Sequence, residues 1–387
     1  MIPTAVVSSR AADRIRRAHP WIYQSDVEDV AAEAGAIVEV LGPRQRYLGR
    51  AFYSDRSQIS LRMLTRGEED VDETFWRERL TAALAFREVL TINATAYRLV
   101  HGEADLLPSL IVDRYAGVLV VQALSQGMDR YLPALLPILV ELTGAAGVLA
   151  RNDPRVRLLE GLEQRVDVLH GDVPETILVH ESGIEYDVDP RRGQKTGLFL
   201  DQRENRDAAS FYAHGRGLDC FSYNGGFGLR LASRCEAVES LDISADAVER
   251  ITTNATRNGI TNLRAREANV FDELRHFEKT GERFDTIVLD PPAFAKNKAS
   301  VPKALAGYKD INLRALRLLN AGGYLITCSC SYNVDEATFA EVIYEASVDS
   351  DVPVTVVEKR MQGRDHPVLL GVPETYYLKC LIVRRVG

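Results

Sequence analysis

The sequence predicts an α/β protein whose C-terminal half is a doubly wound, mainly parallel sheet, preceded by a small mostly-β domain and an α+β domain. Three observations support this. Beyond Gly217, apolar strands alternate regularly with amphipathic helices. Acidic residues directly follow several of these strands, at the edge where such sheets bind ligands. The 387 residues are also too many for one ordinary core, so several domains are expected.

Residues 1–72 are predicted to form the mostly-β domain. AIVEVLGPRQRYLGRAFY contains two apolar runs separated by a Gly-Pro turn, and SQISLRML shows strand-like alternation. Near the start, SSRAADRIRRAHPWIY would place Arg10, Arg14 and Arg17 on one face if it is helical, where they could contact phosphates. The alternative is a solvated helix next to a core tryptophan.

Residues 73–188 are predicted to form the α+β domain. The acidic stretch GEEDVDET has helix-start character, and FWRERLTAALAFREVL has apolar residues at helical spacing. RLVHGEADLLPSLIVDRYAGVLVVQAL then indicates three strands, and YLPALLPILVELTG indicates a second helix.

Residues 189–387 are predicted to form the domain with the parallel sheet. Its strands are expected in GLDCF, AVESLDI, FDTIVLD and GYLITCS, and helices in SADAVERITTNATRN and GYKDINLRALRLLN. Functional residues should therefore lie just after these strands.

Composition narrows the class of protein. The net charge of −8 gives no support for a strongly basic, sequence-independent nucleic-acid binder. The five cysteines are an odd number and lie in the C-terminal half, which favours thiols in a reducing compartment. Neither a secretory signal nor an apolar run long enough to span a membrane is recognisable. A cytoplasmic protein without a membrane partner is expected.

The loop after the first strand, LDCFSYNGGFGL, is the predicted cofactor site. Its glycines do not fit the G-x-G-x-x-G spacing that seats a pyrophosphate, which disfavours nicotinamide and flavin cofactors. Glycines without a phosphate cradle suit a nucleoside cofactor without phosphate, of which S-adenosylmethionine is the common one. The candidate cofactor-binding residues here are Asp219, Phe221, Tyr223, Gly225 and Gly226.

Two later strand ends complete this prediction. Asp242 ends the second strand, about 20 residues downstream, where a carboxylate can accept hydrogen bonds from both ribose hydroxyls. Asn269 follows the third strand, and its carbonyl can accept from the adenine amino group. Alternatively, the glycines only permit a tight turn and Asp242 only caps the next helix.

The motif FDTIVLDPPAFAKNK marks the predicted chemical site. Asp290 follows the fourth strand, Pro291 and Pro292 stiffen the backbone, and Phe294 adds an aromatic ring. A flipped base could lie with its face on Phe294 and its Watson–Crick edge on Asp290. Lys296 in the same loop is a further substrate-side candidate. A rigid loop with a buried Phe is the alternative.

Two cysteines stand one residue apart in GYLITCSCS. They supply only two of four zinc ligands, with no Cys-x-x-Cys or His pair nearby, so no metal site is expected. Cys328 lies within the apolar run and is interpreted as core packing. Cys330 lies past the run, between two serines, at the fifth strand end beside the DPP loop.

A thiol at that position suits methyl transfer to pyrimidine C5. This carbon is a poor nucleophile, and thiolate addition at C6 raises its electron density. Transfer to a ring or exocyclic nitrogen needs no cysteine. Because a free thiol has a pKa of about 8.5, a nearby cation should stabilise the thiolate. Lys296, Lys298 and Lys309 are the candidates from the sequence.

Several motifs in order carry a family resemblance. They are HPWIYQSDV, RLVHGEADLLPSLIVDRY, KTGLFLDQRENR, CFSYNGGFG, DPPAF, GYKDIN, TCSCS and DHPV…PETYYLKC. Over nearly its whole length the chain resembles the RlmI-like class I S-adenosylmethionine-dependent rRNA methyltransferases. The resemblance implies an N-terminal PUA domain, a central EEHEE-type α+β domain and a Rossmann-like methyltransferase domain.

The resemblance also implies an activity and residue roles. The activity is methylation of cytosine C5 in large-subunit (23S) rRNA, which makes rRNA the expected partner. Cys330 of Ser-Cys-Ser matches the family's nucleophile and Asp290 orients the base. Gln202 of LDQR joins the cofactor contacts, whereas Asn269 departs from the acidic residue usual at its position. The PUA resemblance favours RNA contacts by Arg14 and Arg17.

Other functions stay open at this point. Uracil C5 uses the same covalent chemistry, and related enzymes with a DPP loop modify a guanine nitrogen without the Ser-Cys-Ser cysteine. A methyltransferase for protein or a small molecule is another class, and a non-catalytic RNA-binding ribosome-assembly protein is a third. The joint presence of Asp219, Asp242, Asp290 and Cys330 argues against the last. The oligomeric state is undetermined, with a homodimer as one option.

Overall fold

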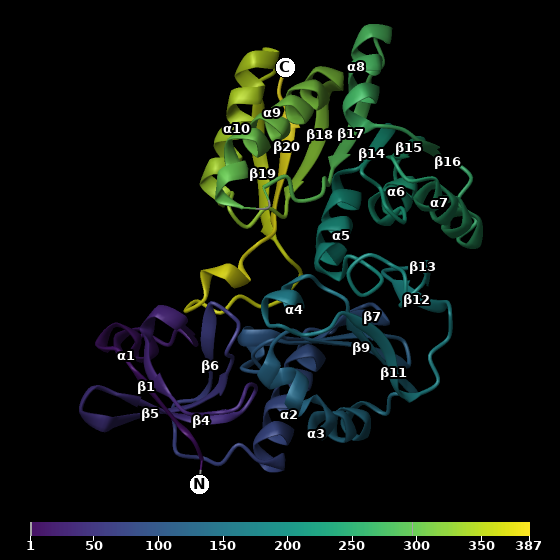
Figure 1. Ribbon diagram of the computed structural model, residues 1–387. Helices are drawn as coiled ribbons and strands as arrows, with labels where there is room; N and C mark the ends of the chain where they lie inside the picture. The colour runs from purple at the N-terminus through teal and green to yellow at the C-terminus, as the bar shows by residue number, and fades with distance from the viewer. Residues whose placement is uncertain (1, 296) are drawn as a thin grey trace. The chain divides into compact units, whose positions relative to one another are not determined.

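A computed structural model describes residues 2–295 and 297–387, so the candidate Lys296 lies outside the described residues (Figure 1). Contacts between residues divide the chain into two compact units. The first unit consists of Met1–Val179, Val188–Leu198 and Arg364–Thr375, and the second of His180–Asp187, Phe199–Gly363 and Tyr376–Gly387. The predicted division into domains 1–72, 73–188 and 189–387 stays a prediction.

The first unit begins with a six-stranded sheet in the order β2-β6-β5-β4-β1-β3, in which β1 and β4 are parallel and the other pairs antiparallel. Its strands are β1 (Thr4–Val7), β2 (Trp21–Tyr23), β3 (Val27–Val30), β4 (Ile37–Gly42), β5 (Arg46–Tyr53) and β6 (Ile59–Thr65). Helix α1 (Ser9–Arg16) begins after Ser8, whose hydroxyl accepts a hydrogen bond from the Ala11 N–H (3.3 Å). Ala11 and Ile15 bury the apolar side of α1 against this sheet.

A second sheet follows in the order β11-β10-β9-β8-β7. Its strands are β7 (Ala96–His101), β8 (Leu110–Tyr115), β9 (Val118–Ala123), β10 (Gly147–Asn152) and β11 (Arg165–Gly171), accompanied by α2 (Glu73–Val89), α3 (Gln126–Thr143) and α4 (Val156–Leu159). Phe52 of the first sheet stacks on Trp76 of α2 with ring centroids 5.9 Å apart. Phe52 and Leu64 of the first sheet thus join the hydrophobic core of the second sheet, and contacts place both sheets in a single unit.

A buried cluster of charged residues ties a C-terminal segment into the first unit. Asp365 is fully buried, and its carboxylate accepts hydrogen bonds from the Arg98 backbone N–H (2.9 Å) and pairs with His366 Nδ1 (3.1 Å). Arg87 donates to the Asp365 carbonyl (2.8 Å) and forms a two-pronged ion pair with Asp105. Because an unpaired buried charge is costly, these contacts explain how residues 364–375 are held there.

The second unit is built on a seven-stranded sheet in the order β16-β15-β14-β17-β18-β20-β19. The strands are β14 (Arg216–Cys220), β15 (Ala237–Asp242), β16 (Leu263–Glu267), β17 (Phe284–Leu289), β18 (Leu319–Ser329), β19 (Val354–Met361) and β20 (Lys379–Arg385). The first five in chain order are parallel, and β20 and β19 add antiparallel strands at one edge. The predicted doubly wound, mainly parallel sheet is confirmed. A hairpin of β12 (Ile177–Glu181) and β13 (Ile184–Val188) precedes it.

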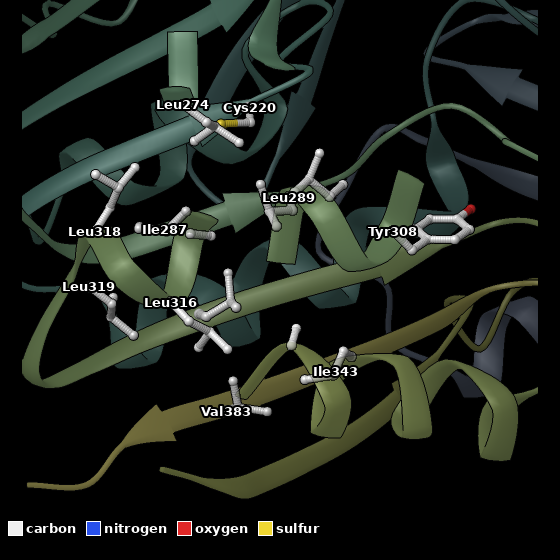
Figure 2. Close-up of a cluster of buried hydrophobic side chains, with 14 of the residues drawn as sticks. Cys220, Leu274, Ile287, Leu289, Tyr308, Leu316, Leu318, Leu319, Ile343 and Val383 are labelled. Carbon is white, nitrogen blue, oxygen red and sulfur yellow. The ribbon is translucent and has the colours of Figure 1, made fainter. Parts of the chain in front are cut away.

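Helices cover both faces of this sheet (Figure 1). They are α5 (Arg203–Tyr212), α6 (Gly226–Ala232), α7 (Ala245–Arg257), α8 (Val270–Thr280), α9 (Val301–Leu318) and α10 (Glu336–Ser350). The helices α8, α9 and α10 pack over one face, whose aliphatic core includes Leu289 and Leu316 (Figure 2). On the other face, α5 and α6 cover a core that includes Cys328. With both faces covered, the loops at the carboxyl ends of the parallel strands are left to carry function.

Candidate functional site

The loop after β14 has an unusual backbone. Phe221 and Tyr223 both adopt positive φ angles of 64° and 53°, as does Gly225 at 85°. Non-glycine residues pay a conformational cost in this region and keep it only where surrounding contacts hold the loop. The Ser222 N–H donates to the Leu241 carbonyl (3.0 Å), and the Gly225 N–H donates to the Ser222 carbonyl (2.8 Å). Gly226 opens α6, as predicted.

Asp219 lies at the end of β14 and is almost completely buried. Its Oδ2 accepts hydrogen bonds from the Gly228 N–H (2.9 Å) and from the Ser240 hydroxyl (3.4 Å). Its Oδ1 has no hydrogen-bond partner among the residues that the structure describes. Burial raises the pKa of this carboxyl group to about 6, although the hydrogen bonds lower it. The unpartnered oxygen can accept from a bound ligand.

Asp242 joins the ends of β14 and β15. Its Oδ2 accepts from the Tyr223 N–H (2.8 Å), and its Oδ1 accepts from the Ser244 N–H (3.0 Å). The Ala268 N–H donates to the Asp242 carbonyl (2.8 Å), which brings in the end of β16. The cap of α7 is Ser244, whose hydroxyl accepts from the Ala247 N–H, and Asp242 supports that cap through the Ser244 N–H. Each carboxylate oxygen of Asp242 keeps a second lone pair for a ligand.

Asn269 is exposed and caps α8, because its Oδ1 accepts from the Phe271 N–H (3.0 Å). An amide oxygen and a carboxylate oxygen can both accept this bond. The predicted cofactor residues of the three strand ends therefore lie together, apart from Gln202.

Gln202 is buried beside the DPP loop. Its Nε2 donates to Asp290 Oδ1 (2.8 Å), and its Oε1 accepts from Asn205 Nδ2 (2.7 Å). The Asp290 N–H in turn reaches the Cys220 carbonyl (3.4 Å) at the end of β14. The structure thus places Gln202 on the Asp290 carboxylate, and its predicted cofactor contact stays a prediction.

Cys330 follows the last residue of β18 and is half-buried, whereas the other four cysteines are buried. Its thiol lies 3.9 Å from the Pro291 carbonyl, so the Ser-Cys-Ser and DPP motifs meet. Cys328 is fully buried opposite Cys380 of β20, and burial raises the pKa of its thiol well above the usual range. The two cysteines are thus in different environments.

The two serines that flank Cys330 bind one tyrosine. Tyr308 of α9 is fully buried, and its hydroxyl lies 3.0 Å from Ser329 Oγ and 2.9 Å from Ser331 Oγ. Its ring stands at the end of the aliphatic core with the hydroxyl pointing away from it (Figure 2). Ser331 Oγ also accepts from the Ala295 N–H of the DPP loop (3.1 Å). Sequence reasoning missed Tyr308, whose signal is a hydroxyl-bearing aromatic on the buried side of GYKDIN.

Phe294 belongs to a row of aromatic rings. Its centroid lies 4.7 Å from that of Tyr308 and 6.0 Å from that of Phe271, which in turn lies 6.4 Å from Phe221. Packing therefore fixes Phe294, but the side chain stays partly exposed, whereas the alternative interpretation expected a buried Phe. Pro291 is buried and Pro292 is exposed.

Three lysines were suggested by the sequence as the cation near Cys330, and of these Lys296 lies outside the described residues. Lys309 forms ion pairs with Glu345 (3.0 Å) and Asp349 (2.9 Å) of α10. Lys379 of β20 is buried instead next to the Ser-Cys-Ser turn, with its Nζ donating to the Ser331 carbonyl (2.7 Å). A lysine that opens the apolar run KCLIV is the signal that could have revealed it.

The candidate RNA contacts belong to the first unit. Arg14 donates to Asp26 Oδ2 (3.0 Å) and its guanidinium lies 4.8 Å from the centroid of the Tyr23 ring. Arg10 binds Oδ1 of the same buried Asp26 (2.6 Å). Arg17, just past α1, is exposed. Two of the three arginines of α1 thus share the single carboxylate of Asp26.

Across residues 2–295 and 297–387, no group of three or more His, Cys, Asp or Glu side chains is arranged to hold a metal ion. Within the same described part of the chain, no helix is long and apolar enough to cross a membrane.

Comparisons with known proteins match this architecture. A family model described as a PUA-like domain matches residues 6–66, and one described as an S-adenosylmethionine-dependent methyltransferase matches residues 97–384. A Streptococcus mutans protein described as a SAM-dependent methyltransferase has the same fold, with a TM-score of 0.84 and 20% identity over 99% of this chain and 100% of that chain. A methyltransferase complexed with SAH gives a TM-score of 0.85 at 21% identity, again over 99% and 100% of the two chains.

The fold and its strand-end site therefore define an S-adenosylmethionine-dependent methyltransferase with an N-terminal PUA-like domain. Relatives named "Ribosomal RNA large subunit methyltransferase I" are 40% identical in Tolumonas auensis, over 100% of both chains, and 39% identical in Shewanella amazonensis, over 95% of this chain and 96% of the relative. The chain belongs to this family. The predicted family, fold class and cofactor are confirmed.

Proposed function

We propose that this protein methylates C5 of a cytosine in large-subunit ribosomal RNA through a covalent adduct with Cys330. The relatives' names give the substrate class. The observation that carries the chemistry is the half-buried Cys330 thiol against the Pro291 carbonyl of the DPP loop, 3.9 Å away. A thiol at this position serves attack on an aromatic carbon, whereas transfer to nitrogen would not use it.

The residues at the ends of β14, β15 and β16 are proposed to hold the cofactor. They suit a ligand with hydroxyls and an amino group and no phosphate, because they offer carboxylate and carbonyl oxygens, including the unpartnered Asp219 Oδ1. When bound, S-adenosylmethionine supplies an electrophilic methyl group. The proposed contacts are Asp219, Phe221, Tyr223, Gly225, Gly226, Asp242 and Asn269, with Gln202 assisting from the side of Asp290.

In the proposed mechanism, Asp290 and Phe294 hold the base while Cys330 acts on it. Asp290 accepts from the exocyclic amine of cytosine, and Gln202 fixes the rotation of its carboxylate. The Cys330 thiolate adds to C6, so that the electron pair of the C5–C6 bond becomes available at C5 for the new bond to the methyl carbon. The bond between that carbon and the cofactor sulfur would break in the same step, with its electron pair going to sulfur, so that S-adenosylhomocysteine would be the leaving group. Loss of the C5 proton to a base then restores the double bond and expels Cys330 as a thiolate. Arg14 and Arg17 are proposed to contact RNA phosphates.

Mass mapping of methylated cytosines in ribosomal RNA, with and without this protein, tests the proposal. One cytosine is expected to lose its methyl group when the protein is absent and to regain it with the wild-type chain. Methylation of a uracil or of a guanine nitrogen instead would show that the base is wrong. Loss of no methyl group would favour a non-catalytic role.

The paired cysteines provide a matched test of the nucleophile. Cys330→Ala should abolish methyl transfer, lowering kcat by at least about a thousandfold, because the C5 carbon is no longer activated. Cys328→Ala should keep activity and cost about 1 kcal/mol of unfolding free energy, because it only leaves a small cavity. RNA containing 5-fluorocytosine should form a stable adduct with the Cys328→Ala protein and none with the Cys330→Ala protein. If Cys328→Ala is the inactive variant, the assignment of the nucleophile is wrong.

A further inference from the structure

Lys379 is an ammonium group inside the protein. It opens β20, lies directly opposite Ser329 of β18 in the antiparallel register, and is 2% exposed. Burying an ammonium ion without compensation is costly, so its position requires partners that accept hydrogen bonds or carry negative charge.

The direct partners of Lys379 are neutral. Its Nζ donates to the carbonyls of Ser331 (2.7 Å) and Tyr377 (2.8 Å). Among the residues described by the structure, Lys379 forms no ion pair with a carboxylate. The charges that act on it are those of Cys330 and of Asp335, and the Asp335 carboxylate already accepts from the Thr338 N–H at the start of α10 (2.7 Å). The charge of Lys379 is therefore not neutralised by a contacting anion.

The surroundings of Cys330 point to the same pairing. Tyr308 from α9 also interacts electrostatically with this thiol, and burial raises the pKa of its phenol, so that it stays neutral. The DPP loop offers the Pro291 carbonyl to the thiol, and the Asp290 carboxylate of that loop is engaged by Gln202. Lys379 interacts electrostatically with the same thiol and brings a positive charge to it.

We propose that Lys379 is a positioning residue that holds Cys330 as a thiolate and anchors the Ser-Cys-Ser turn through the Ser331 carbonyl. This inference deepens the proposed function, on which its catalytic meaning rests. A neighbouring cation favours the thiolate, which is the reactive form for addition to C6. The same charge also favours the thiolate as leaving group when the adduct breaks, so one residue assists both the formation and the cleavage of the S–C6 bond.

The protonation of Lys379 limits the pH range of this effect. Burial lowers the pKa of its ammonium group to about 8, while the charges of Cys330 and Asp335 raise it. Near neutral pH the group is mostly charged and supports the thiolate. As pH rises past about 8, the charge is lost, at a pH where a thiol ionises without help.

Alkylation of Cys330 by iodoacetamide tests the pairing directly. The rate is followed between pH 5.5 and 9.5 by mass spectrometry of the Cys330 peptide, and the other four cysteines are buried. In Lys379→Met the pH midpoint of alkylation should rise by about one unit, so that the rate at pH 6.5 falls about tenfold. Lys379→Arg, which keeps the charge, should stay within about threefold of wild type.

Two further variants separate charge from structure. Lys309→Met removes a lysine that is paired with Glu345 and Asp349 and should leave the midpoint unchanged. Lys379→Gln keeps hydrogen-bond donors for the Ser331 and Tyr377 carbonyls but has no charge. It should shift the midpoint as Lys379→Met does. This variant provides the test if the methionine variant does not fold. Circular dichroism and SAH binding establish that each variant is folded.

A wild-type midpoint in folded Lys379→Met or Lys379→Gln would overturn the proposal. The measurement needs neither RNA nor methyl transfer, so it does not depend on the proposed reaction. Methylation by Cys330→Ala would refute the proposed function and leave the alkylation result intact. Conversely, the inference alone would be refuted if the enzyme methylates RNA but the pH midpoint of Cys330 alkylation is the same with and without the charge of Lys379.

Discussion

At the scale of single residues, the carboxyl group of Asp219 is buried away from solvent. One of its oxygens has hydrogen bonds from Gly228 and Ser240, and the other has no partner within the described part of the chain. Burial therefore raises its pKa from 3.8 to about 6. The amino group of S-adenosylmethionine is the kind of cation that such a carboxylate lacks, which supports its proposed role.

This shift predicts a pH dependence of stability. Because the folded pKa of Asp219 exceeds the unfolded one, its contribution is fully present below about pH 4 and is lost as pH rises through about 6. A shift of two units corresponds to about 3 kcal/mol. Asp219→Asn should remove this dependence, increase the unfolding free energy at pH 8 by about 2 kcal/mol, and weaken SAH binding.

Calorimetry between pH 4 and 8 and titration with SAH check this prediction. The exposed Asp246→Asn serves as the control and should change neither property appreciably. Equal pH profiles for wild type and Asp219→Asn would contradict the account of Asp219.

Single residues also show what the sequence can and cannot predict. Cys328 and Cys330 were separable because one lies inside an apolar run and the other beyond it, and the structure places them in different environments. Lys379 was not predictable as a neighbour of Cys330, because 49 residues separate them and only the pairing of β20 with β18 brings them together. The ion pair of Arg14 with Asp26 was not predictable either, because Asp26 lies in a different element.

At the scale of elements, the loop between β14 and α6 is held by its neighbours. Phe221, Tyr223 and Gly225 all adopt positive φ, and the Asp242 carboxylate accepts a hydrogen bond from the Tyr223 N–H of the loop. A Cβ at Gly225 would meet Ile251 at 3.2 Å and Leu229 at 3.3 Å. The loop therefore depends on glycine both for its backbone angle and for its packing.

Gly225→Ala should lower the unfolding free energy by about 2 kcal/mol, from the positive φ and the tight contacts together. A displaced loop should also weaken SAH binding about tenfold, which corresponds to 1.4 kcal/mol. Gly259 is the matched control, because it too has a positive φ (64°) and has nothing within 4 Å of an added Cβ. Gly259→Ala should cost about 1 kcal/mol and leave SAH binding unchanged. Equal effects of both variants on binding would argue against this role of the loop.

The elements of the second unit were predicted best where local pattern decides. The strands β14, β15, β17 and β18 each contain a short apolar run, and each was located from the sequence within a few residues. The antiparallel strands β19 and β20 were not assigned. The reason is that β19 is largely exposed, with no clear period of two in its apolar residues, and that its partner β20 follows after a long connection. Local periodicity does not encode which strands pair across such a distance.

At the scale of the whole molecule, neither compact unit is a continuous stretch of chain. Residues 364–375 belong to the first unit. There the Asp365 carboxylate accepts a hydrogen bond from the Arg98 N–H and contacts His366. The sequence predicted consecutive domains because composition and periodicity change near their boundaries, whereas a returning segment leaves no such signal. The buried charges of Arg87 and Asp365 reveal the return only in three dimensions.

Asp365→Ala should destabilise the first unit by about 3 kcal/mol, because it leaves buried donors without their acceptor. Both tryptophans, Trp21 and Trp76, lie in this unit, so urea unfolding followed by tryptophan fluorescence reports on it. The exposed Asp246→Ala should leave that transition in place. An unchanged midpoint in Asp365→Ala would show that residues 364–375 do not stabilise the first unit.

The position of residues 364–375 in the chain also affects when the first unit can be completed during synthesis. During synthesis Arg87 is made 278 residues before the Asp365 carbonyl that it binds, and Lys379 emerges later still. A nascent chain can thus complete neither its first unit nor the surroundings of Cys330 until residues 364–379 have left the ribosome. A chain interrupted before these residues would lack both, so the first unit and the thiol site are completed at the same stage of translation.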